Sequence, residues 1–287
     1  MNRPAALDTV GQSRSRPAMA LPQWPRMLFD AWRGETIRLV GTTVCVPGAR
    51  RIRLSVVAGN MRIHRLLDRL VQPGATVIDV GANIGYNTLH AARLAGASGR
   101  VVAVEPTPDN LEVLRRNLAA AQLTNVVVAP VAAGRAASTR DLFVRGQISA
   151  VNSLFPESCY AAVTAVLPVP VVPLDDLVEG AADVVKIDVE GAELEVLEGM
   201  PRILRTPGAS LIVEWHPQLQ RLAGFDADAL PRWLLAQGWQ LHAASHIAMH
   251  ALSTADVPAL TARLLRRGRP VELVARNRHG ACISAGS

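Results

Sequence analysis

The segment Val77–Gly85, with the sequence VIDVGANIG, constrains the fold more than any other part of the chain. Residues that favour β-strands surround Asp79 and lead into a turn of small residues, and a run compatible with a helix follows over 86–94. In a strand–loop–helix unit of this kind, backbone N–H groups approach a ligand closely. The segment therefore predicts the nucleotide-binding unit of an α/β enzyme.

The spacing of residues around this loop selects the nucleotide. A second expected strand over 101–105 ends in Glu105, an acid that can accept hydrogen bonds from a ribose diol. A dinucleotide-binding G-x-G-x-x-G pattern that starts at Gly81 requires glycines where Asn83 and Tyr86 stand, and no Gly-Lys-Ser/Thr of a P-loop occurs. The loop instead fits D-x-G-x-N-x-G, a variant of the D-x-G-x-G-x-G loop of S-adenosylmethionine (SAM) methyltransferases, since Asn enters left-handed backbone conformations more easily than most residues. The alternative, a glycine-rich turn that only joins strand to helix, is weakened by the two correctly spaced acids.

Composition sets the class of protein. The chain of 287 residues is 49% hydrophobic and 19% charged, which is sufficient for one large α/β core with an appendage. Cys45, Cys159 and Cys282 form no C-x-x-C pair, so we expect packing thiols in a reducing compartment. No apolar run has the length of a secretory signal or a membrane span, and we therefore expect a cytoplasmic protein.

Charge is distributed unevenly along the chain. Residues 1–70 and 261–287 are basic, residues 71–260 are acidic, and all but one of the 30 basic residues are arginine. The basic ends could contact an anionic partner or a membrane face, but an ordinary Arg-rich surface is the interpretation that we favour. Because only 4% of the residues are aromatic, a nucleic-acid partner is not expected.

Two regions are expected, an N-terminal cap over 1–71 and the main domain over 72–287. In the cap, prolines interrupt residues 1–30, alternation around Pro47-Gly48 predicts a β-hairpin, and helical spacing predicts a helix. In the main domain strands alternate with helices around an irregular stretch, which is typical of a parallel sheet covered on both faces. The expected elements are a hairpin over 36–46 and 51–58, a helix over 60–71, strands over 75–80, 101–105, 125–129, 183–188 and 209–214, helices over 85–96, 108–121, 191–204 and 226–237, an irregular stretch over 131–172 with short β-like pieces, and a closing antiparallel pair of 239–242 with 271–274 around a helix over 254–267.

A second group of polar residues lies where two of these strands end. Asp188 and Glu190 lie at the end of the fourth expected strand, and Glu214 and His216 lie at the end of the fifth. Because ligands of open α/β sheets bind outside the carboxyl ends of the strands, we expect three carboxylates and an imidazole to converge beside the nucleotide crevice. The alternative is that Asp188 or Glu190 caps a helix or pairs with Lys186.

The chain resembles the FkbM-type family of SAM-dependent methyltransferases in several spaced motifs. These are DVGANIGYNT (79–88), VVAVEPTPDN (101–110), NVVVAPVAAG (125–134), VPLDDL (172–177), VVKIDVEGAELEVLEGM (184–200) and LIVEWHP (211–217). The resemblance covers about residues 72–217. It implies a class I methyltransferase fold, with helices on both faces of a mostly parallel seven-stranded sheet whose last strand is antiparallel. It also implies methylation of hydroxyl groups on sugars, glycans, polyketides and other secondary metabolites.

Positions in the glycine loop and after the next two strands are expected to bind SAM: Asp79, Gly81, Asn83, Gly85, Asn87, Glu105, Pro106, Ala132 and Ala133. The two glycines and Asn83 let the backbone approach the amino-acid and ribose parts of SAM. Asp79 orients the loop or accepts a hydrogen bond from the ammonium of SAM, and Glu105 binds the ribose hydroxyls. Pro106 and the two alanines border the adenine, while Asn87 either contacts SAM or caps a helix.

Catalysis needs few further groups, because the sulfonium of SAM already activates the methyl group and the enzyme supplies alignment and a base. Asp188 and His216 are the candidates for that base, and Glu214 is expected to orient it or to bind a metal. A Mg²⁺ ion held by Asp188, Glu190 or Glu214 is an alternative that carboxylate chemistry allows, although we favour a metal-free site.

Three histidines recur at four-residue spacing: His242, His246 and His250. On one helix they would suit a metal. A strand over 239–242 would instead scatter their side chains, so we do not expect a metal site there.

Two other functions remain open at this point. A nicotinamide-dependent oxidoreductase on a related fold is disfavoured by the failed dinucleotide spacing, and a non-catalytic SAM-binding scaffold is disfavoured by the acids and imidazole at the sheet edge. The N-terminal hairpin and residues 135–170 and 242–270 are expected to form the acceptor pocket, and they contain no motif that identifies a small-molecule or glycan acceptor. A dimer is compatible with the sequence.

Overall fold

The computed structural model describes residues 61–146, 149–158, 161–244 and 248–277 in full. Of the residues before these, it describes the backbone of three short strands, β1 (Asp8–Thr9), β2 (Thr36–Leu39) and β3 (Thr42–Cys45).

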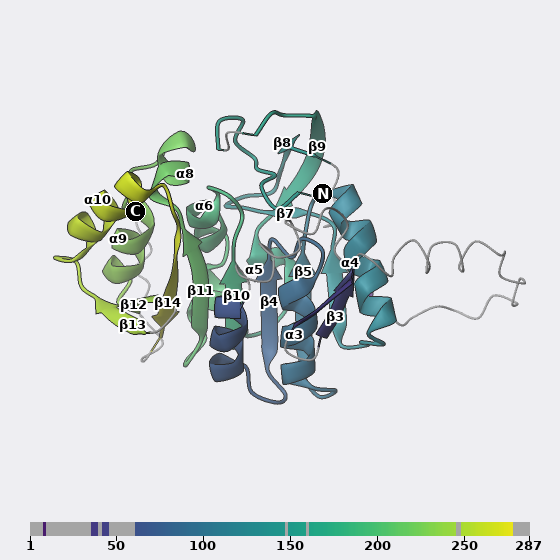
Figure 1. The fold of residues 1–287 in the computed structure, drawn as a ribbon. Helices are drawn as coiled ribbons and strands as arrows, with labels where there is room; N and C mark the ends of the chain where they lie inside the picture. Colours follow the sequence, from purple (N-terminus) through teal and green to yellow (C-terminus); the bar gives the residue numbers. More distant parts are fainter. Residues whose placement is uncertain are drawn as a thin grey trace, which may run out of the picture.

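Among the described residues, a nine-stranded sheet forms the centre of the protein, in the order β1-β6-β5-β4-β10-β11-β14-β12-β13 (Figure 1). Its inner strands are β4 (Thr76–Val80), β5 (Arg100–Val104), β6 (Val126–Ala129), β10 (Val184–Ile187), β11 (Ser210–Trp215), β12 (Gln240–Ala244) and β14 (Val271–Arg276). The strands from β6 to β11 are parallel neighbours, and β14 runs antiparallel between β11 and β12. The expected seven-stranded sheet with an antiparallel last strand is therefore confirmed. β1 and β13 (Met249–Leu252) extend it by antiparallel pairing at its two edges.

Helices cover both faces of this sheet, as the continuous apolar sequence of its central strands requires. On one face, buried side chains of the helical residues 61–70, α3 (Tyr86–Ala95) and α4 (Pro108–Ala120) pack against the sheet. The opposite face is covered by α5 (Leu174–Leu177), α6 (Glu193–Glu198), α7 (Pro201–Leu204), α9 (Ala229–Ala236) and α10 (Val257–Arg267). The predicted helix over 60–71 thus shares a hydrophobic core with α3 and α4.

The stretch predicted to be irregular, 131–172, contains a second sheet of three strands. β7 (Ala132–Ala133), β8 (Ser138–Val144) and β9 (Ala165–Val172) pair in the order β7-β9-β8. Figure 1 shows this small sheet standing beyond the end of the main sheet, above β4 and β5. It therefore overhangs the edge at which the parallel strands end.

Two predicted elements differ from the structure. The single helix expected over 191–204 is two short helices, α6 and α7, because Pro201 cannot continue a helix and instead begins α7. The hairpin is also shifted. Residues 36–46 were expected to form only its first strand, but Thr36 pairs with Cys45, so this segment contains both strands. Only two residues, one of them Gly41, separate β2 from β3, which is a common hairpin spacing. The expected second strand, 51–58, lies outside the described residues.

The closing antiparallel pair is confirmed, because β12 pairs with β14 and α10 lies between them in the chain. His242 is in β12 and His250 is in β13, where His250 pairs with Ala243. Neighbouring residues of a strand point to opposite faces, so His242 and His250 point away from each other. His246 lies outside the described residues. Within the described part of the chain, no helix has the length and apolar composition needed to cross a bilayer.

Candidate active site

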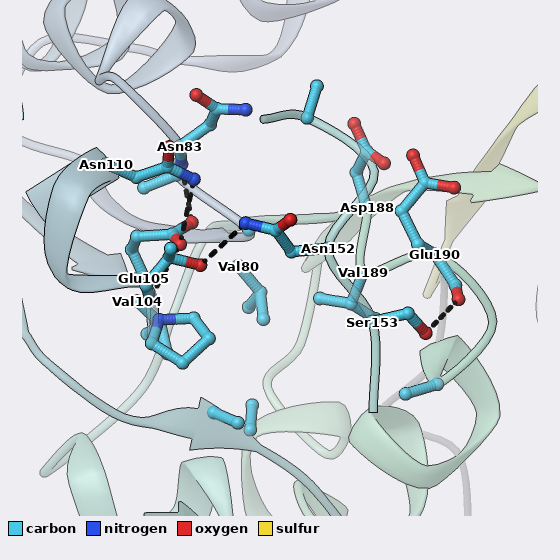
Figure 2. Close-up of a pocket in the computed structure, with 18 of the residues that line it drawn as sticks. Val80, Asn83, Val104, Glu105, Asn110, Asn152, Ser153, Asp188, Val189 and Glu190 are labelled. Atoms are coloured by element: carbon cyan, nitrogen blue, oxygen red, sulfur yellow. Dashed lines mark hydrogen bonds between the residues drawn. The ribbon is translucent and has the colours of Figure 1, made fainter. Parts of the chain in front are cut away.

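A cleft lies at the carboxyl ends of β4, β5 and β10, below the small sheet. Figure 2 shows two groups of side chains in it, with Asn83, Glu105 and Asn110 on one side and Asp188 and Glu190 on the other. Residues of the glycine loop and of the segment 149–154 complete its wall. This is the position at which open α/β sheets bind their ligands.

The glycine loop has the backbone that its sequence predicts. Gly81 and Asn83 have positive φ angles of 75° and 51°. A Cβ atom at Gly81 would lie 1.9 Å from the carbonyl oxygen of Asp188, so only glycine allows the loop to pass this close to the end of β10. The Asn83 side-chain oxygen accepts a hydrogen bond from the Ile84 N–H at 2.6 Å, which stabilises the left-handed conformation of Asn83.

Glu105 ties this loop to the end of β5. Its Oε2 accepts a hydrogen bond from the Asn83 N–H at 2.9 Å, and its Oε1 accepts bonds from the Thr107 N–H at 2.9 Å and the Asn110 amide at 3.2 Å. Burial raises the pKa of Glu105, and these hydrogen bonds act in the opposite direction. Because each carboxylate oxygen has two acceptor positions, Oε2 keeps one for a ligand in the cleft.

Residues 149–153 cross the cleft as a strap that sequence analysis did not identify. The Ser149 carbonyl accepts hydrogen bonds from the Asn83 side chain at 3.2 Å and from Asn110 at 3.0 Å. Asn152 donates to the Thr107 hydroxyl at 3.2 Å. At the far end of the strap, the Ser153 hydroxyl donates to the Glu190 carbonyl at 2.8 Å (Figure 2). The strap therefore joins both sides of the cleft by polar contacts.

Asp79 lies behind the cleft and is 2% exposed. Its Oδ2 accepts a hydrogen bond from the Thr88 hydroxyl at 2.6 Å, and its Oδ1 lies 3.3 Å from the Lys186 ammonium. Both oxygens are thus held by side chains of the protein, which fits the expected role in orienting the loop. Burial alone would lower the pKa of Lys186, but the carboxylates of Asp79 and Asp188 outweigh it and raise that pKa above its usual range.

Three predicted carboxylates converge at the other side of the cleft. One oxygen each of Asp188, Glu190 and Glu214 lies within 4.8 Å of the other two. Burial and repulsion from Asp188 raise the pKa of both Glu190 and Glu214 well above the usual value. Such a cluster is stable only if protons or a cation reduce its charge.

His216 is not joined to this cluster by any contact among the described residues. It precedes α8 (Pro217–Leu222) and is half-buried, and burial lowers its pKa. Its Nδ1 is buried without a hydrogen-bond partner in the described chain. The structure thus brings the three predicted acids together, and no contact within the described residues joins the predicted imidazole to them.

Glu193 supports the loop that carries Glu190, whose φ of 56° is rare for a residue other than glycine. The Glu193 Oε1 accepts hydrogen bonds from the Val189 N–H at 3.3 Å and the Gly191 N–H at 3.0 Å. Its Oε2 accepts a bond from the Gln220 amide at 2.6 Å. Glu193 is 3% exposed, and burial raises its pKa to about 7. It therefore fixes the residues on either side of Glu190.

Most of the other expected cofactor positions also line the cleft: Asn87, Pro106, Ala132 and Ala133. Asn87 is 8% exposed, and its side-chain oxygen has no hydrogen-bond partner among the described residues. Gly85 is different, because it does not line the cleft. A Cβ atom there would lie 2.4 Å from the Leu114 side chain, so this glycine allows α3 and α4 to pack closely.

Comparison with known proteins places the site in a family context. The family model for the methyltransferase FkbM domain matches residues 79–241. The chain is similar to "Hexuronic acid methyltransferase AglP" of Haloferax volcanii, with 33% identity over 168 residues that make up 57% of this chain and 65% of that protein. It is also similar to "Protein-L-isoaspartate O-methyltransferase 1" of Archaeoglobus fulgidus, with 33% identity over 38% of this chain and 49% of that protein.

The chain thus spans about half to two thirds of the length of these two relatives. Among solved structures, a methyltransferase FkbM from Methylobacillus flagellatus KT is 15% identical, with a TM-score of 0.46 over 77% of this chain and 60% of that one.

The raised pKa of Glu193 generates a prediction for the variant Glu193→Gln. Because the folded pKa of about 7 exceeds the usual 4.5, the protonated carboxyl stabilises the fold below about pH 4.5, and this contribution is lost as the pH rises through 7. Gln cannot ionise, so the stability of the variant relative to the natural chain should rise by roughly 3 kcal/mol between pH 4.5 and pH 8.

Urea unfolding of both proteins at pH 4.5, 6 and 8 measures this difference. Glu112→Gln, which changes an exposed acid on α4, serves as the control and should leave the pH dependence unchanged. If the free energy of unfolding had the same pH dependence in the Glu193→Gln variant and the natural chain, the raised pKa assigned to Glu193 would be contradicted.

Proposed function

The chain belongs to the FkbM family of methyltransferase domains, and on that premise we propose that it transfers the methyl group of SAM to a hydroxyl group on a sugar, glycan or secondary metabolite. The observation that supports this most is the arrangement of the cleft. A left-handed glycine loop bound to Glu105 faces a cluster of carboxylates across the carboxyl edge of one sheet.

The loop side of the cleft suits the cofactor. SAM supplies a methyl group that its sulfonium has already activated. Glu105 keeps one acceptor position for a ribose hydroxyl, because its Oε2 accepts only one bond from the protein. Asn87 has an unpaired side-chain oxygen on the cleft wall and can accept a hydrogen bond from an ammonium group. Pro106 and Ala132 offer an apolar border for the adenine.

Asp188 is the base that we propose for the acceptor hydroxyl. It lines the cleft, whereas His216 and Glu214 do not, and the Lys186 ammonium lies 3.6 Å from its Oδ2. Asp188 can accept the hydroxyl proton while the oxygen attacks the methyl group in line with the leaving sulfur. Glu190 and Glu214, with their raised pKa values, can share a proton, and Glu190, which lines the cleft, can hydrogen-bond the acceptor.

A similar protein and the charge of the cleft both bear on the class of acceptor. The name of the Haloferax volcanii relative supports a sugar acceptor. Asp188 and the Glu190–Glu214 pair, which keeps one negative charge when it shares a proton, would repel an anionic sugar, so a neutral hexose should be a better acceptor for this chain than a hexuronate.

Ligand binding and methyl transfer test the proposal together. SAM and its demethylated product S-adenosylhomocysteine (SAH) should raise the melting temperature, and NAD should not. Methyl-labelled SAM should then transfer label to a neutral sugar or metabolite fraction. Stabilisation by NAD alone would indicate an oxidoreductase instead, and tight SAH binding without transfer to any fraction would indicate a SAM-binding scaffold.

The variant Asp188→Asn tests the base. Since general bases contribute about 100-fold to 10,000-fold, kcat should fall by at least roughly 100-fold, while the Kd for SAH stays within a few-fold of the natural value. Asp226→Asn, which changes an exposed acid, is the matched control. An unchanged kcat for Asp188→Asn would refute this role, and a loss in His216→Gln would then identify the other predicted base.

A chelator distinguishes a metal-free site from a metal site. Asp188, Glu190 and Glu214 have the oxygen donors and the spacing to hold Mg²⁺, which would polarise the acceptor oxygen. We expect the full rate after dialysis against EDTA, because Lys186 already offsets Asp188 and a shared proton offsets the two glutamates. Loss of the rate with recovery on added Mg²⁺ would instead support the metal site.

A further inference from the structure

Lys186 is the one lysine in the sequence, and it lies at the centre of the sheet. It belongs to β10, between β4 and β11, and is 3% exposed. Its neighbours along the strand, Val185 and Ile187, are fully buried. Burial of an ammonium group in such a place is costly unless specific partners compensate for it, and an apolar residue would avoid that cost. The lysine therefore needs an explanation beyond packing.

The partners of Lys186 lie on two different sides of the cleft. On the cofactor side, its ammonium lies 3.3 Å from Asp79 Oδ1 and donates hydrogen bonds to the carbonyl oxygens of Val80 at 3.4 Å and Gly81 at 3.0 Å. On the acceptor side, it lies 3.6 Å from Asp188 Oδ2. One cation thus contacts both the glycine loop and the carboxylate proposed as the base.

The backbones of the two sides also meet at this point. The close approach of Gly81 to the Asp188 carbonyl leaves no room for a side chain between the loop and the end of β10. Thr88 holds the second oxygen of Asp79, so Asp79 is fixed from both sides. A shift of the Lys186 ammonium would therefore be transmitted to the loop and to Asp188 together.

We propose that Lys186 is a positioning residue that holds the cofactor loop and the Asp188 carboxylate in register. The effect of Lys186 on the chemical step rests on the proposed function, whereas its effect on the cofactor loop does not. The proposal predicts a combined effect on cofactor affinity and on kcat, which neither a binding residue nor a base produces alone.

The variant Lys186→Met keeps the length of the side chain and removes its charge. We expect the Kd for SAH, measured by calorimetry, to rise about tenfold. We expect kcat per SAH-binding site to fall by on the order of 100-fold, the size of effect that a misplacement of about 1 Å produces.

As comparators, Glu105→Gln should change mainly the Kd, and Asp188→Asn mainly kcat. Arg62→Met removes another cation from the same acidic edge, where Arg62 pairs with Glu272, and should leave the Kd for SAH unchanged.

A second measurement needs no variant of Lys186 itself. Protein labelled with ¹³C at the lysine Cε gives a single side-chain signal, because the chain has one lysine. This signal should shift when SAH is added to the natural chain, and it should differ between the natural chain and Asp188→Asn. Both shifts would support the proposal even if Lys186→Met does not fold.

Three results would overturn the proposal. The Lys186→Met variant could have a lower melting temperature but the natural Kd and kcat per binding site, or it could change only one of these two constants. The lysine signal could also respond to neither SAH nor the Asp188→Asn substitution. These results differ from failure of the proposed function. If the natural chain binds SAH and methylates nothing, the methyltransferase assignment fails, while the Kd and the lysine signal still decide whether Lys186 holds the loop.

Discussion

The contact between the glycine loop after β4 and the end of β10 is the constraint on which the rest of the site depends. These two strands are parallel neighbours, so their carboxyl ends meet, and the absence of a side chain at Gly81 lets the loop touch the Asp188 carbonyl. A buried lysine crosses the same contact. The cofactor side and the acceptor side of the cleft are therefore parts of one packed unit, and a displacement of either would disturb both.

Electrostatics defines the acceptor side of this unit. Three carboxylates lie close together where water is partly excluded, and the raised pKa values of Glu190 and Glu214 reduce the charge that these two side chains carry near neutral pH. Glu193 holds the backbone around Glu190 in a conformation that residues other than glycine seldom adopt. Unusual backbone geometry and perturbed acids in one cleft are typical of functional sites.

The sequence predicted the parts of the structure that local pattern determines. Buried parallel strands are continuous apolar runs, so the order and type of the main elements were recognisable, as were the loop at Gly81 and the acids at the ends of β10 and β11. Long-range contacts were not recognisable. The strap over 149–153 has no spacing signal, and the packing role of Gly85 depends on Leu114, which lies in another helix. Lys186 was considered only as an ion-pair partner of nearby acids, because its contacts with the loop after β4 depend on the pairing of two distant strands. The break at Pro201 and the position of the hairpin show how a strong local pattern can mislead.

A crystal structure of the protein with SAH bound tests the central claim most directly. The account predicts the ribose hydroxyls against Glu105, the adenine beside Pro106 and Ala132, and the sulfur directed towards Asp188 across the cleft. SAH bound at another place, or bound in this cleft with its sulfur directed away from Asp188, would contradict the account.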